Sequence, residues 1–323
     1  MSPPSTLRTA NNTHADDVED PSHTPLDEDV SPSLQQLIRL QIFTPMTLLL
    51  ALGANLVTAF AFHPTLGEVN DQYETIWTPK KELVGGYLLL MYVLEISYCL
   101  WITMTKNAAT REMIVNGVGL RFCLANVFQA LWSIFFMLRL FLVSEIFLLL
   151  SAFLMLTVWM TLLKYPANFR NPFTWLFVHV PMRMYLLFLI NLAIWQNGLI
   201  ALRWYRYRGP EDGHRQGKWE SEHETHAWIA FGVITGLGLI DAFITFLGQD
   251  LAWAGCTIFL FIAILLGTDK PVQVVVPLIL TASLQVVALI AAYVWRMYEI
   301  KKYGNIRLPE DDEEEDGHPH PRR

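Results

Sequence analysis

The chain has 323 residues, of which 53% are hydrophobic and 16% are charged. Soluble proteins carry about 25% charged residues, so this composition is poor in charge. Seven of the 30 acidic residues fall in residues 1–41 and seven more in residues 310–316, and long apolar stretches lie between them. This balance excludes a soluble globular enzyme, a secreted disulfide scaffold and a basic nucleic-acid-binding protein. The sequence predicts an integral membrane protein.

Eight apolar stretches are long enough to cross a bilayer as helices, since a hydrocarbon core about 30 Å thick requires roughly 17–25 mainly apolar residues. Consecutive apolar residues, as at 146–150, exclude the alternating pattern of a barrel strand. The prediction is an all-α polytopic membrane helical bundle with about eight spans. Seven spans are the alternative, because the third contains Arg121 and the seventh is short. The expected spans are residues 43–62, 83–105, 118–138, 146–163, 173–202, 227–248, 251–267 and 272–295.

The two ends of the chain are expected to lie outside the membrane. Residues 1–41 and 297–323 are predicted to be acidic disordered tails, and residues 42–296 to form the transmembrane domain. The first tail lacks the basic start and apolar stretch of a cleaved signal peptide. Lysine and arginine are nearly balanced between the two sets of loops, so the positive-inside rule assigns no orientation. The acidity of the tails favours a cytosolic location for both.

Besides Arg121, near the start of the third span, four ionisable side chains stand inside the predicted spans, where a charge costs at least about 2.5–3.5 kcal/mol. They are Glu95, His179, Arg183 and Asp241. His179 and Arg183 are four residues apart and therefore share one helix face. A structural interpretation pairs Glu95 or Asp241 with Arg183, or leaves the acid protonated. A functional interpretation makes them a proton-coupled or ligand-binding cluster.

Uncharged polar residues in the spans are expected to face protein, because each side-chain amide needs a partner across a helix interface. Asn126 and Gln129 lie three residues apart on one face of the third span. Trp132 sits well inside the same span, where it either lines a pocket for a flat apolar ligand or simply packs. The amides embedded in apolar sequence are Asn55, Asn126, Gln129, Asn191, Gln196 and Gln285.

Small residues in the sixth span predict close helix packing. Gly232 and Gly236 form a G-x-x-x-G motif, and Gly238 follows it. Because glycine has no side chain, a neighbouring helix can approach closely at such positions. The motif indicates a contact and no activity.

The sequence shows no constellation for catalysis or metal binding. Cys99, Cys123 and Cys256 fall inside spans, where cysteine often serves as a small buried hydrophobe. No CxxC or Cys/His spacing indicates a metal site, and no nucleophile–base pair can be named. We therefore expect a non-enzymatic protein in the lipid bilayer, without metal or cofactor.

Three segments, taken in order, resemble the TspO/translocator family, the tryptophan-rich sensory proteins. Residues 76–79 read Ile-Trp-Thr-Pro and are similar to the family's Trp-Thr-Pro-Pro turn, with Lys80 replacing the second proline. Residues 124–136, Leu-Ala-Asn-Val-Phe-Gln-Ala-Leu-Trp-Ser-Ile-Phe-Phe, resemble its third helix, and residues 180–195 resemble its fifth. The likeness covers residues 43–202, and the three further spans lie beyond that family's five helices. The whole arrangement is also similar to a group of fungal multi-pass membrane proteins without an established activity.

The resemblance implies a pocket among the first five helices for a flat hydrophobic ligand, such as a tetrapyrrole or a sterol. Two alternatives stay open. The first is a proton- or ion-coupled secondary transporter with Glu95 or Asp241 as the ion site. The second is a structural membrane protein without small-molecule activity. The residues expected at the pocket are Trp77, Pro79, Asn126, Gln129, Trp132, Tyr185, Asn191 and Trp195.

Overall fold

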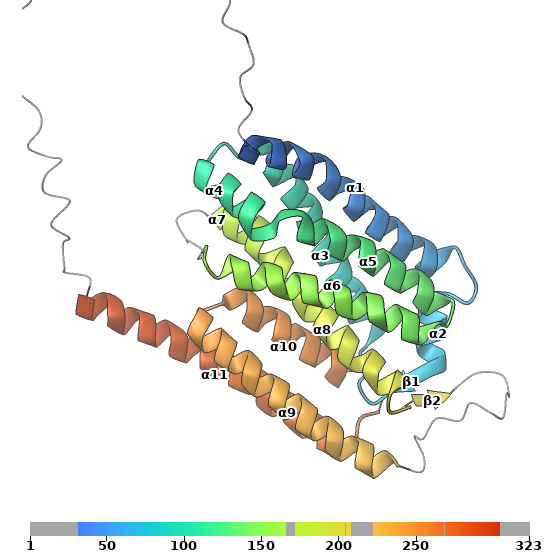
Figure 1. The fold of residues 1–323 in the computed structure, drawn as a ribbon. Helices are drawn as coiled ribbons and strands as arrows, with labels where there is room; N and C mark the ends of the chain where they lie inside the picture. Colours follow the sequence, from blue (N-terminus) through green and yellow to red (C-terminus); the bar gives the residue numbers. More distant parts are fainter. Residues whose placement is uncertain (1–31, 166–171, 204, 208–221, 268, 304–323) are drawn as a thin grey trace, which may run out of the picture.

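The computed structural model describes residues 32–165, 172–203, 205–207, 222–267 and 269–303, which form a bundle of long helices running side by side (Figure 1). The first part of the chain contains α1 (Pro32–Phe60), α2 (Leu66–Gln72), β1 (Tyr73–Thr75), α3 (Lys81–Met104), α4 (Ala108–Glu112), η1 (Met113–Val118), α5 (Gly119–Met137) and α6 (Phe141–Leu162). The second part contains α7 (Pro172–Thr174), η2 (Trp175–His179), α8 (Val180–Ile200), β2 (Tyr205–Tyr207), α9 (His223–Gly248), α10 (Leu251–Leu265) and α11 (Val272–Tyr303). The predicted all-α polytopic bundle is confirmed.

Within the described ranges, seven helical segments are long and apolar enough to cross a membrane. The predicted seventh span, 251–267, is the helix α10, which has only 15 residues. At 1.5 Å per residue it is about 22 Å long, less than the hydrocarbon thickness of about 30 Å. It still lies alongside α8, α9 and α11 and packs against all three. The two described ends, at Pro32 and Tyr303, consequently lie at the same end of the bundle (Figure 1).

The terminal helices extend past the predicted limits of the membrane domain. α1 begins at Pro32, so residues 32–41 are helical, and Leu37 and Leu40 are buried against the bundle. α11 continues to Tyr303, beyond the limit expected at residue 296. A helix can continue beyond the membrane as long as its backbone hydrogen bonds and side-chain packing continue, so the length of the apolar stretch gives only a minimum length for the helix. The remaining parts of both predicted tails lie outside the described residues.

Two π-helical segments interrupt the regular helices. η1 (Met113–Val118) is followed by Gly119, whose φ of 56° is one that glycine adopts freely. η2 (Trp175–His179) stands directly before Pro181, which lies in the first turn of α8. Because proline lacks an N–H and its ring clashes with the preceding turn, a regular helix is disturbed there. The irregularity near Pro181 takes the form of a π-helical turn.

The helices α9 and α11 pack closely through one of the three glycines noted in the sequence. A Cβ added at Gly238 would lie 2.2 Å from Cγ2 of Thr281, whereas Gly232 and Gly236 have open space around them. The carbonyl of Gly238 also accepts a hydrogen bond from Nε2 of Gln285 at 3.2 Å. The close contact thus comes from Gly238 and not from the two glycines of the motif.

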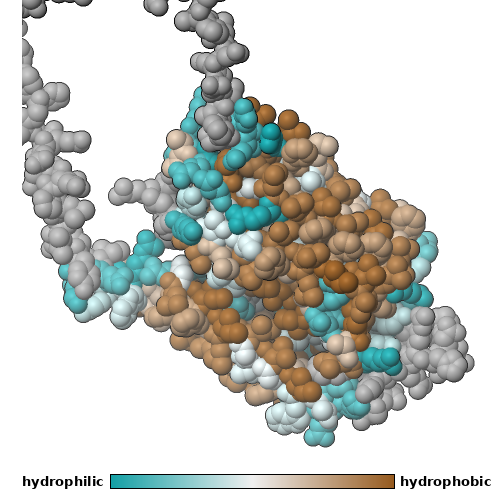
Figure 2. All heavy atoms as spheres, viewed as in Figure 1, coloured by the Kyte–Doolittle hydropathy of each residue, from teal (hydrophilic) through white to brown (hydrophobic). Residues whose placement is uncertain are grey.

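The outer surface is apolar around the middle of the bundle. Figure 2 shows a broad hydrophobic face, with hydrophilic residues gathered towards the ends. Large side chains such as Phe60 and Leu89 are 79% and 69% exposed. Soluble monomers rarely expose contiguous apolar patches of more than a few hundred Å². This surface suits a lipid environment, and the chain is an integral multi-pass membrane protein.

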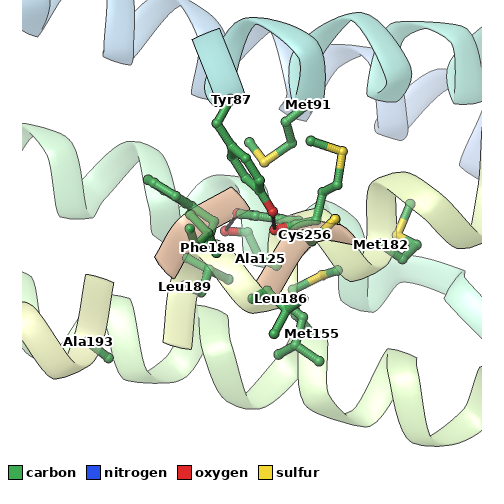
Figure 3. Close-up of a cluster of buried hydrophobic side chains, with 14 of the residues drawn as sticks. Tyr87, Met91, Ala125, Met155, Met182, Leu186, Phe188, Leu189, Ala193 and Cys256 are labelled. Atoms are coloured by element: carbon green, nitrogen blue, oxygen red, sulfur yellow. Dashed lines mark hydrogen bonds between the residues drawn. The ribbon is translucent and has the colours of Figure 1, made fainter. Parts of the chain in front are cut away.

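The three C-terminal helices join the rest of the bundle through α10, which packs against α3 and α8. The hydroxyl of Tyr87 on α3 donates to the carbonyl of Met184 at 2.8 Å, and its ring stacks on Phe188 with centroids 6.2 Å apart. Figure 3 shows Tyr87 pointing towards Cys256 of α10, with Met91 beside it. Flexible, polarisable Met and Cys side chains fill irregular gaps well. The two parts of the chain therefore share one core.

Candidate ligand-binding pocket

A cavity of about 340 Å³ lies among the helices α1, α2, α3, α5 and α8. Ligand pockets typically measure about 300–1,000 Å³ and are mostly apolar with a few polar groups. Side chains of α1, α2, α3, α5, α8 and the turn around Trp77 line the cavity, and α10 adds Leu260 and Ile264. All of these side chains are uncharged except Lys81 at the start of α3. The lining is therefore almost entirely uncharged.

The cavity brings together six of the eight side chains that the sequence assigns to a pocket. Tyr185 and Asn126 do not line it. The Tyr185 hydroxyl donates to Oε1 of Gln129 at 3.2 Å, so Tyr185 supports a lining residue from behind. Asn126 is buried deeper in α5. The six that line the cavity are Trp77, Pro79, Gln129, Trp132, Asn191 and Trp195.

Two tryptophan rings in the wall are held in place by hydrogen bonds from their indole N–H groups. Trp132 donates to Oε1 of Gln196 at 2.7 Å, and Nε2 of Gln196 in turn donates to Oγ of Ser144 at 2.6 Å. Trp195 donates to Oγ1 of Thr78 at 3.2 Å. A buried indole usually finds such a partner, which fixes the plane of its ring. These rings give the cavity flat, preformed walls.

The pocket also contains two polar atoms that no protein group satisfies. The indole N–H of Trp77 and Oδ1 of Asn191 are buried without a hydrogen-bond partner. Nδ2 of Asn191 is already used, because it donates to the carbonyl of Leu187 at 2.9 Å. Leaving a buried polar group unpaired costs about 1–3 kcal/mol. The residues of the lining thus keep one donor and one acceptor without a protein partner.

The turn that carries Trp77 and Pro79 is fixed from several directions. β1 pairs antiparallel with β2, and the backbone N–H of Thr75 donates to Oγ1 of Thr78 at 2.8 Å. Nζ of Lys270, in the connection from α10 to α11, donates to the carbonyls of Ile76 and Thr78 at 2.7 and 2.8 Å. The C-terminal part of the chain therefore holds one wall of the pocket. Sequence patterns did not indicate this, because the contact joins segments nearly 200 residues apart.

The buried ammonium group of Lys270 is expected to make stability depend on pH. Burial lowers its pKa from the usual 10.5 to about 8, although the Glu74 carboxylate acts in the opposite direction. Between pH 8 and 10.5 the unfolded chain therefore binds more protons than the folded chain. The free energy of unfolding of the wild type, relative to that of a Lys270→Met variant, is therefore expected to rise by about 1–3 kcal/mol between these two pH values. Below about pH 8 the difference is expected to be constant and at its lowest.

Thermal unfolding of both proteins in the same detergent from pH 7 to 10.5 measures this difference. Lys301→Met is the matched control, since Lys301 is exposed at the end of α11. A difference between the wild type and Lys270→Met that is constant over the whole pH range would contradict the prediction.

A second, polar cavity of about 580 Å³ adjoins the first and shares Asn70, Pro79 and Lys81 with it. Its lining includes four acidic side chains and two lysines. One of these lysines, Lys81, forms an exposed ion pair with Asp71 at 3.5 Å. The first cavity thus has a polar region beside it.

The ion pairs inside the bundle differ from the predicted ones. Arg183 pairs with Asp250, the N-cap of α10, and not with Glu95 or Asp241. Asp241 instead accepts a hydrogen bond from the indole of Trp253 at 3.0 Å. The predicted pairing of Arg183 is wrong because Asp250, which falls between the predicted spans 227–248 and 251–267, is buried in the bundle at the start of α10. An acidic residue directly before an apolar helix is an N-cap signal that could have found it.

Glu95 and His179 are both buried among the helices. Neither carboxyl oxygen of Glu95 has a hydrogen-bond partner, and Nδ1 of His179 has none. The electrostatic neighbour of His179 is Arg183, one turn along the same helix. In the described part of the chain, no three His, Cys, Asp or Glu side chains are placed to hold a metal ion.

Together, the repeated membrane crossings and the tryptophan-walled cavity define a polytopic membrane protein with a pocket inside its helical bundle. The chain belongs to the TSPO-like protein family, whose model matches residues 41–295. The match extends past residue 202 through α9, α10 and most of α11, so the three C-terminal helices are part of the matched unit. No curated protein and no solved structure matches the chain.

Proposed function

We propose that this protein binds a flat hydrophobic small molecule, of the tetrapyrrole or sterol type, in the cavity among its first helices. The observation that carries the proposal is an apolar chamber in which the indole N–H of Trp77 and Oδ1 of Asn191 have no partner. A ligand with an apolar body and one polar edge satisfies both atoms while its body contacts Trp132 and Trp195. The resemblance of residues 43–202 to the TspO family supports the same class of ligand.

We propose binding or sensing as the role of the pocket, and not catalysis. Lys81 is the titratable side chain of the cavity lining, and it lies at the rim with Asp71 as its ion-pair partner. The other polar groups are amides and indoles, which neither attack a substrate nor transfer protons readily near neutral pH. Such groups orient a bound molecule, which supports a non-enzymatic function.

Quenching of tryptophan fluorescence by protoporphyrin tests the proposal with the purified protein in detergent. Saturable quenching is expected, and Trp132→Ala is expected to raise the Kd about tenfold, since an aromatic contact is worth about 0.5–1.5 kcal/mol beyond its buried area. Trp228→Ala is the control, because Trp228 is exposed on α9, away from the cavity. Absence of saturable quenching by protoporphyrin and by a fluorescent sterol would contradict ligand binding.

A second function, proton-coupled transport, is favoured by one observation: Glu95 is buried in a membrane helix without a hydrogen-bond partner. Intramembrane carboxyl groups often mark proton relays. Uptake of a pocket ligand into proteoliposomes under a pH gradient would support transport. Uptake that is unchanged in Glu95→Gln would count against proton-coupled transport. A protein that shows neither binding nor uptake would have a structural role.

A further inference from the structure

A chain of hydrogen bonds leads from the floor of the pocket, formed by Asn55 and Gln129, into the interior of the bundle. Nδ2 of Asn55 donates to the Tyr92 hydroxyl at 2.6 Å, and Nε2 of Gln129 donates to the same oxygen at 3.3 Å. The Tyr185 hydroxyl donates to Oε1 of Gln129 at 3.2 Å. Asn55 and Gln129 line the cavity, whereas the two tyrosines lie behind it. The pocket is therefore connected to buried hydroxyl groups on α3 and α8.

Glu95 and Asn126 lie one helical turn beyond this floor. Glu95 follows Tyr92 by three residues on α3, and Asn126 precedes Gln129 by three residues on α5. Residues three apart share a helix face about one turn apart. Because α3 and α5 run in opposite directions, both steps lead the same way in space. The acid and the amide therefore belong to the same layer of the bundle.

The layer that contains Glu95 is closed on its far side by aromatic rings. The rings of Tyr98 and Phe122 meet edge to face with centroids 5.6 Å apart, and Phe122 meets Tyr185 in the same way at 6.1 Å. Ala51 and Leu48 of α1 are buried at the corresponding height. Because the rings and alkyl groups are apolar, the hydroxyl groups of Tyr92 and Tyr185 are the polar connection between the layer of Glu95 and the pocket. The species that such a connection can carry is the proton.

Glu95 and Asn126 have complementary hydrogen-bonding groups only when Glu95 is protonated. Each is 1% exposed, and neither the two carboxyl oxygens nor the two amide atoms has a partner. A carboxylic acid and a primary amide can donate to each other at once, through the acid O–H and the amide N–H. A carboxylate can only accept, so it would leave the amide oxygen facing a negative charge. The proton on Glu95 thus decides whether the acid and the amide can satisfy both of each other's polar groups, a pairing that is not formed in the structure.

The groups that face Glu95 provide no positive charge. Its electrostatic neighbours are Tyr92 and Cys99 on α3 and Tyr185 on α8. Within the described residues, the other titratable groups nearby are Cys123 on α5 and Tyr98 on α3. The buried residues of α1 at this height, Leu48 and Ala51, are apolar. His179 of η2 has Arg183 as its electrostatic neighbour. Hydroxyl and thiol groups stay protonated near neutral pH. Glu95 is therefore the acid of this layer that can change charge.

We propose that Glu95 and Asn126 form a proton-binding pair whose proton is released when the pocket is occupied; this inference rests on the proposed function. A ligand that hydrogen-bonds to Gln129 or Asn55 takes over bonds now made to the Tyr92 hydroxyl. The lone pairs of the Tyr92 oxygen, which those bonds now occupy, can then accept the proton of Glu95. In this step the O–H bond of Glu95 breaks and a new O–H bond forms on Tyr92, the original Tyr92 proton leaves towards the pocket and reaches solvent, and the new O–H donates to the Glu95 carboxylate.

The test uses 1-pyrenemethanol, a flat apolar molecule with one hydroxyl and no group that titrates between pH 6 and 9. Energy transfer from tryptophan to pyrene measures its binding to the full-length protein in detergent, and a pH-indicator dye in weakly buffered solution measures protons released. Wild-type protein is expected to release up to one proton for each probe bound. Its Kd is then expected to fall with rising pH, by at most about tenfold per pH unit.

Glu95→Gln keeps the size of the side chain and an amide pair with Asn126, so it separates the proton from the packing. It is expected to bind the probe without proton release and with a Kd independent of pH, and Tyr92→Phe is expected to lose most of the release. Asp241→Asn is the control, because Asp241 bonds to Trp253 on α10 and should leave the release unchanged. Binding without proton release in the wild type, or release that persists in Glu95→Gln, would overturn the inference. No binding of the probe at all would instead reject the proposed function and the coupling with it.

Discussion

Replacement of Asp250 by alanine is expected to destabilise the protein by about 3–5 kcal/mol. Asp250 forms the ion pair with Arg183, and the two side chains are only 7% and 11% exposed. Its other oxygen accepts hydrogen bonds from the backbone N–H groups of Ala252 and Trp253 at 3.1 and 3.2 Å. The alanine variant therefore leaves a guanidinium charge buried without its partner. It also removes the N-cap of α10, which alone is worth about 0.5–2 kcal/mol.

Thermal unfolding in detergent, followed by tryptophan fluorescence, measures this loss. Asp250→Asn should lose less than Asp250→Ala, because asparagine is a good N-cap residue even though it carries no charge. Asp269→Ala is the control, since Asp269 is exposed in the next connection. Combining Arg183→Met with Asp250→Asn should recover part of the loss, because the uncompensated charge is then removed. An Asp250→Ala protein with the unfolding temperature of the wild type would contradict the role assigned to the ion pair.

The positions of the helices could be predicted because membrane thickness imposes a length on each apolar stretch. The face of a helix could also be predicted, since residues three or four apart lie together; Gln129 and Trp132 of α5 both line the cavity as this spacing requires. The same spacing did not determine which of the polar residues on this face of α5 line the pocket. Asn126 lies one turn away from Gln129 and is buried outside the cavity lining, and only the packing of the other helices places it there.

Contacts between distant parts of the chain could not be predicted from local patterns. The contribution of α10 to the pocket, through Leu260 and Ile264, depends on how the last three helices dock onto the first part of the bundle. Hydrophobic periodicity identifies a face that needs a partner but does not name the partner. Lys270 illustrates the same limit, because a lysine in a short connection normally indicates solvent, whereas here its ammonium group bonds to two carbonyls of the pocket turn.

Docking of the C-terminal helices onto the pocket wall is expected to depend on Gly267. A Cβ added there would lie 2.3 Å from the carbonyl oxygen of Thr78 and 3.1 Å from that of Ile264. Both are backbone atoms, which cannot rotate away as a flexible side chain can, so Gly267→Ala must push the end of α10 away from the turn around Trp77. Overpacking of this kind typically costs about 1–3 kcal/mol. The displacement should also move Ile264 in the cavity wall and lengthen the bonds from Lys270.

Gly267→Ala is therefore expected to lower the unfolding temperature and to raise the Kd for protoporphyrin by about tenfold, if most of that cost falls on the pocket. Gly255→Ala is the matched control, because Gly255 lies on α10, the helix that Gly267 follows, and has no atom within 4 Å of an added Cβ. Lower stability with unchanged affinity would mean that α10 braces the bundle without shaping the pocket. Unchanged stability and affinity would contradict the close approach itself. A parallel loss of both would show that the pocket is completed by the C-terminal helices, as expected if residues 41–295 act as one unit.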